Sequence, residues 1–405
     1  MSSNNYPIIA IGASIASISF IRTLRLNNDT RRVLLVHGED RLPYKRTKIN
    51  KHMVRGFDKD DFKMADNEWY VDNNVDLIYD RVTDIARDEK YISTQKGAVY
   101  SYEKLLLATG AAAVVPSLSG VDKSEIHGVQ NAYDVDKVLE ACVDKKRFLI
   151  IGGGVEGIET ADQLIRKGKE VILASRMKWP LQKMFPPTLI ETLEQNMHDK
   201  GVQFYKGVSV NAIQKVGEAY QVNLKGQSIA FDVILACTGA VPNSQLATKA
   251  GLKTERGIIV DEYLNTSDAS ILAAGDVAQH AGGVVTGLWH VAEHQGQLAA
   301  LNVIGKPEAH TLPPFRLKTE VFGLFMFSGA YEAVIPGACQ VNEERFGAIH
   351  RVMYYHDDKL KAAVFINDKD RAKEYQKALM EHWEKAKVEA ELPLPPKISF
   401  AFSPA

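Results

Sequence analysis

Residues 148–176 read FLIIGGGVEGIETADQLIRKGKEVILASR, and this stretch decides the fold class. The apolar run Phe148–Ile151 is predicted to be a buried strand, and Val171–Ala174 is predicted to be a second one. Between them, apolar residues recur about once per helical turn. Two strands joined by a helix indicate a βαβ unit, because parallel strands need a long crossover connection.

The turn between the first strand and the helix matches the pattern G-x-G-x-x-G at Gly152, Gly154 and Gly157. The first allows a sharp turn, the second lets the backbone approach a pyrophosphate, and the third allows helix and strand to pack closely. The helix N-terminus adds N–H donors and positive potential. A purely structural turn is the alternative, but the position between a strand and a helix favours dinucleotide binding.

The same arrangement occurs earlier in the chain. A predicted strand near the N-terminus runs into Gly12, but Ser14 and Ser17 stand where the second and third glycines would be. Serine is small, and its hydroxyl can donate a hydrogen bond to a phosphate. A further pair of similar apolar strands ends in Thr-Gly at Gly110 and at Gly239. Matched parts in the same order indicate a duplicated dinucleotide-binding domain.

The residues after each second strand predict which nucleotide is bound. An acid there binds a ribose hydroxyl, whereas an arginine accommodates the 2′-phosphate of NADPH. We expect Glu39, which follows the earlier strand, to bind the adenosine ribose. The later strand ends in Ala174, Ser175 and Arg176 without an acid, which favours NADPH and leaves NADH open. A solvated loop arginine is the alternative.

Length and composition exclude several classes. The 405 residues, 45% hydrophobic and 24% charged, suit two or three soluble domains. A net charge of −1 argues against nucleic acid as the main partner. No apolar run approaches the ~20 residues of a membrane span. Cys142, Cys237 and Cys339 form neither a metal-ligand cluster nor a disulfide framework, so we expect a cytoplasmic protein without a metal. Both a monomer and a homodimer are open.

Further motifs resemble those of a known family. They are Leu42–Lys51 (similar to L-P-Y-x-R-P-x-L-S-K), Gly239–Asn243 (G-x-x-P-N), Thr266–Asp276 (T-S-x…A-x-G-D) and Trp289–Gly296 (W-x-x-A-x-x-Q-G). With them, the chain resembles the pyridine nucleotide-dependent flavoprotein reductases. The resemblance is greatest to the branch of rubredoxin reductases, ferredoxin reductases of oxygenase systems and the flavin part of nitrite reductases.

The resemblance implies an α/β fold with two Rossmann-like three-layer dinucleotide-binding domains and a C-terminal α+β domain. We expect residues 1–114 and 243–311 to form a discontinuous FAD-binding domain and residues 115–242 to form an NAD(P)-binding domain. Residues 312–405 are then an α+β interface domain.

The resemblance also implies roles for single residues. Lys51 and Glu159 are expected to form an ion pair near flavin N5, where a cation stabilises negative charge on the reduced flavin. Asp276 is expected to bind the ribityl chain of FAD. The full set of expected cofactor-binding residues is Gly12, Ser14, Ser17, Glu39, Arg46, Lys51, Val82, Thr109, Gly110, Asp276, Trp289, Gly152, Gly154, Gly157, Ser175, Arg176 and Gly239.

The implied function is an FAD-dependent NAD(P)H oxidoreductase that passes electrons to an iron–sulfur carrier of the ferredoxin or rubredoxin type. A basic run from Lys45 to Arg55 offers a docking surface for an acidic carrier, or is a solvated loop. An NAD(P)H oxidase or small-acceptor reductase is one alternative. An FAD-binding protein with slow or lost turnover is another, since Ser14, Ser17 and Glu156 depart from the family pattern. A disulfide reductase is disfavoured, because no cysteine precedes Cys142.

Overall fold

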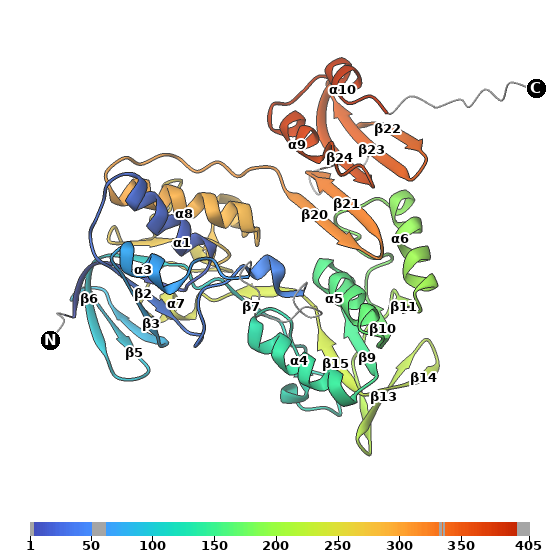
Figure 1. Cartoon of the computed structure of the whole chain (residues 1–405), viewed down its shortest axis with the longest axis horizontal. Coiled ribbons are helices and arrows are strands. Elements are labelled where there is room, and N and C mark those ends of the chain that lie inside the picture. Colours follow the sequence, from blue (N-terminus) through green and yellow to red (C-terminus); the bar gives the residue numbers. More distant parts are fainter. Residues whose placement is uncertain (1–3, 51–61, 332–333, 335–336, 395–405) are drawn as a thin grey trace, which may run out of the picture. The chain divides into compact units, whose positions relative to one another are not determined.

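The structure is a computed structural model of the chain, and we describe its residues 4–50, 62–331, 334 and 337–394 (Figure 1). The chain divides into two compact units. Unit 1 comprises the residues up to 114 together with 130–136 and 239–312. Unit 2 comprises residues 115–129, 137–238 and those from 313 onward. Each unit is described by itself below.

The centre of unit 1 is a mixed sheet in the order β3-β2-β1-β6-β5-β4, with β18 beside β6. Strands β3, β2, β1, β6 and β18 run parallel, and β5 and β4 are antiparallel additions. The bounds are β1 (Asn5–Ile11), β2 (Val33–His37), β3 (Val75–Tyr79), β4 (Val82–Ala86), β5 (Tyr91–Thr94), β6 (Val99–Leu107) and β18 (Ile271–Ala273). The strands that sequence analysis predicted before and after Gly12 are the neighbours β1 and β2.

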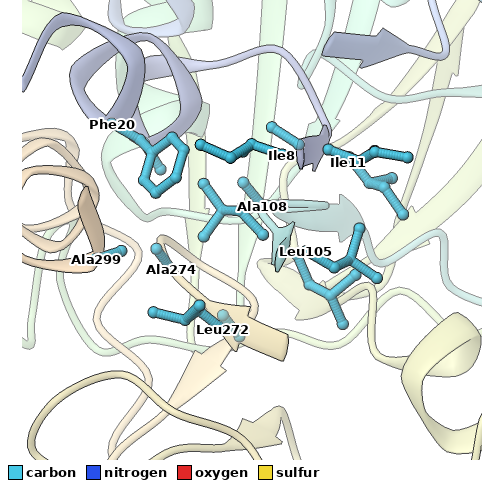
Figure 2. Close-up of a cluster of buried hydrophobic side chains, with 14 of the residues drawn as sticks. Ile8, Ile11, Phe20, Leu105, Ala108, Leu272, Ala274 and Ala299 are labelled. Atoms are coloured by element: carbon cyan, nitrogen blue, oxygen red, sulfur yellow. The ribbon is translucent and has the colours of Figure 1, made fainter. Parts of the chain in front are cut away.

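Two helices, α1 (Ile15–Leu26) and α8 (Trp289–Val303), pack against each other in unit 1 (Figure 1). Their contact is so close that a Cβ atom on Gly296 would lie 2.1 Å from the carbonyl oxygen of Ala16. Beneath them lies a core in which Ile8, Phe20 and Leu105 are buried beside Leu272 (Figure 2). The core thus joins segments far apart in the sequence, which makes the discontinuous unit one packed body.

Shorter elements complete unit 1. The short strands β7 (Ala111–Ala113) and β16 (Ala240–Pro242) pair antiparallel, and β17 (Ile258–Ile259) pairs with β19 (Ala278–Gln279). The remaining helical segments are η1 (Arg46–Lys48), α3 (Asn67–Asp72), α7 (Gln245–Lys249) and η3 (Ala281–Gly283).

Unit 2 has its own parallel sheet, in the order β11-β10-β9-β15-β8. Its strands are β8 (Ile126–His127), β9 (Arg147–Ile151), β10 (Glu170–Ser175), β11 (Gln203–Lys206) and β15 (Val233–Ala236). An antiparallel ribbon of β12 (Gln214–Val216), β13 (Ala219–Leu224) and β14 (Gln227–Phe231) follows β11. The helical elements are η2 (Lys123–Glu125), α4 (Ala132–Asp144), whose first residues belong to unit 1, α5 (Val155–Arg166) and α6 (Pro187–Asp199).

The C-terminal part of unit 2 is an antiparallel sheet in the order β20-β21-β24-β23-β22, with two helices (Figure 1). The strands are β20 (Arg316–Val321), β21 (Leu324–Gly329), β22 (Gln340–Phe346), β23 (Ile349–His356) and β24 (Lys359–Ile366). The helices are α9 (Ala372–Met380) and α10 (Lys385–Glu391). This sheet contacts the βαβ part of the same unit, because the side chain of Asp162 on α5 accepts a hydrogen bond from the N–H of Phe322.

Two sheets, each built around parallel strands with a strand–glycine turn–helix unit, confirm the predicted α/β class with Rossmann-like domains. Among the helices that the structure describes, none has the length and apolar character needed to cross a membrane.

The contact between α1 and α8 predicts a stability effect. Replacing Gly296 by alanine places a methyl group against the backbone of Ala16, and overpacking of this kind costs about 1–3 kcal/mol. We therefore expect G296A to lower the melting temperature. The matched control is G38A, because the nearest atom to a Cβ at Gly38 lies 3.9 Å away on a flexible arginine. Equal melting temperatures for the two variants would contradict the packing seen here.

Candidate cofactor-binding turns

The first glycine turn lies in unit 1, between β1 and α1. Gly12 has φ +97°, and a Cβ atom there would lie 2.2 Å from the carbonyl oxygen of Ala108, at the end of β6. Only glycine fits this turn. Ser17, at the third glycine position, is fully buried, and its Oγ donates a hydrogen bond of 2.5 Å to the carbonyl oxygen of Gly12. The serine therefore replaces close helix–strand packing with a hydrogen bond that ties the helix to the turn.

The second glycine turn lies in unit 2, between β9 and α5, and is built in the same way. Gly152 has φ +126°, and its Cβ would lie 2.0 Å from the carbonyl oxygen of Cys237, after β15. A Cβ on Gly157 would lie 2.0 Å from the carbonyl oxygen of Gly152. Gly154, by contrast, faces open space, with no atom within 4 Å of its Cβ position. Two glycines are thus required by the fold, and the third leaves room for a ligand at the N-terminus of α5.

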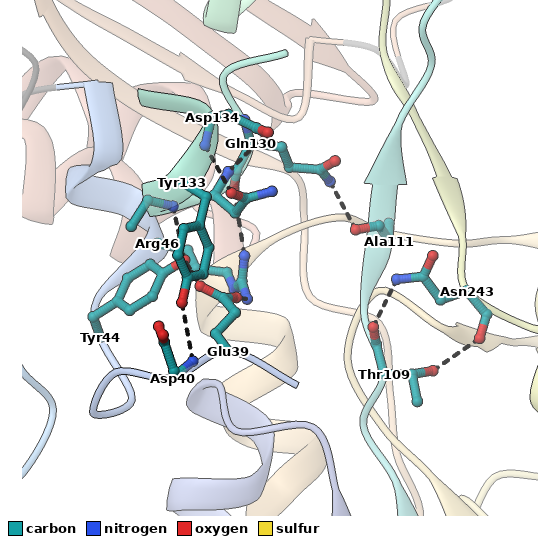
Figure 3. Close-up of polar contacts among 12 residues, drawn as sticks. Glu39, Asp40, Tyr44, Arg46, Thr109, Ala111, Gln130, Tyr133, Asp134 and Asn243 are labelled. Atoms are coloured by element: carbon teal, nitrogen blue, oxygen red, sulfur yellow. Dashed lines mark hydrogen bonds and ion pairs between the residues drawn. The ribbon is translucent and has the colours of Figure 1, made fainter. Parts of the chain in front are cut away.

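Glu39 follows β2 and is held by two neighbours (Figure 3). One carboxylate oxygen accepts a 2.5 Å bond from Arg46 and the other accepts a 2.7 Å bond from the hydroxyl of Tyr44. The same hydroxyl accepts a 3.0 Å bond from the N–H of Ala132. These contacts fix the orientation of the carboxylate, and its remaining lone pairs can still accept from a ribose. The structure thus brings together Glu39 and Arg46, both expected to bind cofactor.

The end of β10 carries the residues expected to select the nicotinamide dinucleotide. Ser175 is buried, and its Oγ accepts a 3.1 Å hydrogen bond from the N–H of Met177. A Cβ on Gly153 would lie 2.8 Å from that Oγ, so the hydroxyl points into the turn. Arg176 is exposed. Of the two residues, Arg176 is therefore the better placed to meet a phosphate from solvent.

The first of the two Thr-Gly segments, Thr109-Gly110, is hydrogen-bonded to Asn243 of the G-x-x-P-N motif (Figure 3). Thr109 Oγ1 donates to the carbonyl oxygen of Asn243 at 2.9 Å, and Asn243 Nδ2 donates to the carbonyl oxygen of Thr109 at 2.8 Å. The N–H of Asn243 donates to the carbonyl oxygen of Gly110. Gly239, at φ +106°, begins the strand segment that carries this motif. The reciprocal bonds hold β7 and β16 together in unit 1.

Asp276 lies in a turn that follows β18, next to Gly275 at φ +81°. Burial raises the pKa of the Asp276 carboxyl, and the nearby positive charge of Arg46 opposes that effect. Within the described residues, no group donates a hydrogen bond to this carboxylate. A desolvated acceptor of this kind fits a hydroxyl-bearing ligand such as the ribityl chain of FAD. Trp289 begins α8, as the family pattern implied.

The other residues expected to be catalytic or to bind a cofactor are placed as follows. Glu159 is on α5, and its Oε1 accepts a 2.6 Å hydrogen bond from Thr319 of β20. Lys51, its expected partner, lies outside the described residues, so the ion pair stays a prediction. Val82 is buried at the start of β4. Ser14 precedes α1 with extended backbone angles, like Gly154 before α5.

Sequence reasoning gave no role to two residues that shape the unit 1 site. Tyr44 was noticed only as part of a motif, yet its hydroxyl joins Glu39 to Ala132. Gln295 was likewise noted only as one position of the W-x-x-A-x-x-Q-G motif. It is fully buried, and its Oε1 accepts a 2.6 Å hydrogen bond from the N–H of Gly275. A glutamine within an otherwise apolar stretch of predicted helix is the sequence signal from which such a role could have been inferred.

The hydrogen bond from Ser17 generates a prediction. S17A removes a partly buried bond while keeping the Cβ that the turn already accommodates, so we expect a loss of about 0.5–1.5 kcal/mol of stability. Thermal melting of the full chain measures it. S19A is the control, because Ser19 is another buried serine on the same helix. A melting temperature of S17A equal to that of S19A would show that the bond contributes nothing.

Comparisons with known proteins agree with this geometry. The family model described as pyridine nucleotide-disulphide oxidoreductase matches residues 6–296. The nitric oxide reductase FlRd-NAD(+) reductase of Shigella flexneri is 29% identical over 91% of this chain and 96% of that protein. The assimilatory nitrate reductase electron transfer subunit of Bacillus subtilis is 26% identical over 89% of this chain, which spans only 47% of that longer protein.

Solved structures agree as well. The NADH:rubredoxin oxidoreductase of Clostridium acetobutylicum is 25% identical, with a TM-score of 0.78 over 94% of this chain and 96% of that chain. The ferredoxin reductase of the CYP199A2 system of Rhodopseudomonas palustris is 23% identical, with a TM-score of 0.82 over 89% of this chain and 91% of that chain, and shows the shared fold. The resemblance found in the motifs is confirmed, and the chain belongs to the pyridine nucleotide-disulphide oxidoreductase family.

Proposed function

We propose that the chain is an FAD-dependent NAD(P)H oxidoreductase that passes electrons to a small iron–sulfur carrier protein. The observation that carries the proposal is the pair of glycine turns of one construction, one in each unit, within a family of oxidoreductases. Two dinucleotide sites in one chain suit an enzyme that brings two dinucleotide cofactors into one reaction.

Unit 1 is the proposed FAD site. Its Gly12 turn leaves the N–H groups at the start of α1 for a pyrophosphate, Glu39 offers a carboxylate for the ribose, and Asp276 offers a second acceptor. When bound, FAD supplies the ability to take a hydride and to release electrons singly. The protein residues bind and orient it. Residues 1–114 and 243–311 are thus the proposed FAD domain, 115–242 the nicotinamide dinucleotide domain and 312–405 the interface domain.

Unit 2 is the proposed site for the nicotinamide dinucleotide, at the turn Gly152–Gly157. Glu156 in that turn disfavours a bound pyrophosphate unless its carboxylate points away. The absence of an acid after β10 and the exposure of Arg176 support NADPH. Two relatives have names that contain NAD(+) or NADH, and these names support NADH instead.

The coenzyme preference leads to a prediction. If Arg176 binds the 2′-phosphate, R176A loses a charge-assisted contact and raises KM for NADPH about tenfold, with little effect on KM for NADH. Steady-state rates with each coenzyme measure this difference. K178A is the control, because Lys178 is also exposed on the same loop. Equal changes with both coenzymes would assign Arg176 to general charge attraction and remove the argument for NADPH.

The proposed acceptor rests on the relatives. Their names describe reductases of FlRd, of rubredoxin and of a ferredoxin. A thiol acceptor is less well supported, because Cys142 and Cys237 are buried and burial raises the pKa of the Cys237 thiol well above its usual range.

An anaerobic coupled assay tests the acceptor. The purified chain is mixed with NAD(P)H and with an oxidised ferredoxin or rubredoxin, and reduction of the carrier is followed by its absorbance. We expect multiple turnovers with at least one of the two carriers, and a slower rate as ionic strength rises, since oppositely charged proteins associate faster at low salt. In a parallel aerobic assay without a carrier, oxygen consumption by a chain that reduces neither carrier would favour the oxidase alternative. Flavin reduction without any acceptor turnover would leave a protein that binds FAD and turns over slowly.

A further inference from the structure

The turn that carries Asp276 is held by a buried glutamine. Gln295 lies on α8 and is fully buried, and its Oε1 accepts a 2.6 Å hydrogen bond from the N–H of Gly275. Because a backbone N–H can only donate, the oxygen of this amide must face Gly275. The NH2 group of Gln295 therefore points the other way.

On that other side lies His280, which follows β19. Its Nε2 is 2.7 Å from Nε2 of Gln295. An amide NH2 can only donate, so the histidine nitrogen must accept, which requires a neutral ring with its proton on Nδ1. Protonation of Nε2 would set two donors against each other at hydrogen-bond distance. The orientation of Gln295, and with it the bond to Gly275, therefore depends on a neutral His280.

The surroundings of His280 favour the neutral form. Burial lowers the pKa of His280. The ring of His310 stacks on it at 4.7 Å between centroids, and His294 of α8 lies 5.8 Å from His310. Burial, together with the positive charges that His280 and His294 carry when protonated, lowers the pKa of His310 to about 4. No carboxylate contributes to the shift of either buried ring, so nothing here favours a second proton on His280.

We propose that Gln295 and His280 are positioning residues that hold the Gly275–Asp276 turn in its FAD-binding shape, and that protonation of His280 releases this turn. The inference rests on the proposed FAD site in unit 1. It adds a sensitivity of FAD affinity to acid beyond that of the Asp276 carboxyl, whose pKa is raised by burial. Affinity is complete above the ordinary histidine pKa of about 6.5 and falls as the pH drops from there toward the lower pKa that burial gives His280, because the FAD-binding form excludes the proton.

The test measures FAD binding, not turnover. The full chain is stripped of flavin and titrated with FAD between pH 7.5 and 5.5, with quenching of flavin fluorescence as the signal and the flavin absorption spectrum as a second readout. This range lies above the pKa of about 4 of His37 and of His310, so neither ring titrates strongly within it. The unmodified chain is expected to bind FAD more weakly toward pH 5.5.

Two variants of His280 distinguish its role as a hydrogen-bond acceptor from its ability to take up a proton. H280Q supplies an amide oxygen near the position of Nε2 but cannot take up a proton, so we expect affinity within about twofold of the original at pH 7.5, and a profile flatter than that of the unmodified chain, since the hydrogen bond is retained. H280L removes the acceptor and leaves the Gln295 NH2 buried and unsatisfied, so we expect at least about fivefold weaker binding at every pH. H294Q is the control, because His294 is an exposed histidine on the same helix whose side chain takes no part in the hydrogen bonds that join Gly275, Gln295 and His280, and it is expected to keep the original profile.

Two results would contradict the proposed role of His280. A profile of H280Q that falls with pH as steeply as that of the unmodified chain would overturn the proposal, as would an H280L variant that binds FAD with unchanged affinity. If H280L does not fold, the profile of H280Q decides. An unmodified chain that binds no FAD at any pH would overturn the proposed function as well, whereas FAD binding with unaffected variants would overturn only the role of His280 and Gln295.

Discussion

The architecture depends on one steric constraint, the passage of a glycine backbone against the end of the neighbouring strand. At Gly12 and at Gly152, a Cβ atom would lie within about 2.2 Å of a carbonyl oxygen, at the residue that follows β6 or β15. The parallel strands can therefore stand side by side only because both turns lack a side chain. The N-terminus of each following helix is thereby placed at the carboxyl end of its sheet, where open α/β sheets bind ligands.

In unit 1 this constraint is supplemented by polar contacts that fix the rest of the site. Ser17 ties α1 to the turn, Tyr44 and Arg46 orient Glu39, and Gln295 holds Gly275. The first three of these bonds join residues five to seven positions apart, and the fourth joins residues twenty positions apart. A site assembled in this way is sensitive to single protons and single methyl groups, since buried polar groups left without partners cost more than their bonds contribute.

Sequence periodicity was sufficient for the fold class and for both glycine turns, because strand and helix patterns and the glycine spacing are local properties. The sequence left open whether Ser14 and Ser17 weaken the first turn, because residue types alone do not show that Ser17 donates a hydrogen bond to the carbonyl oxygen of Gly12. Gln295 and His280 could not be linked from the sequence, since their contact depends on how α8 packs beside β18 and β19. The inward direction of Ser175 likewise depends on the turn at Gly153.

Anaerobic stopped-flow reduction of the FAD-loaded chain by NADPH and by NADH tests the central claim most directly, with flavin absorbance as the signal. The account predicts rapid bleaching by at least one of the two coenzymes, since the two turns then hold cofactors that exchange a hydride. A chain that binds FAD but is bleached by neither coenzyme would contradict the account, because two dinucleotide sites would then be present without the reaction that joins them.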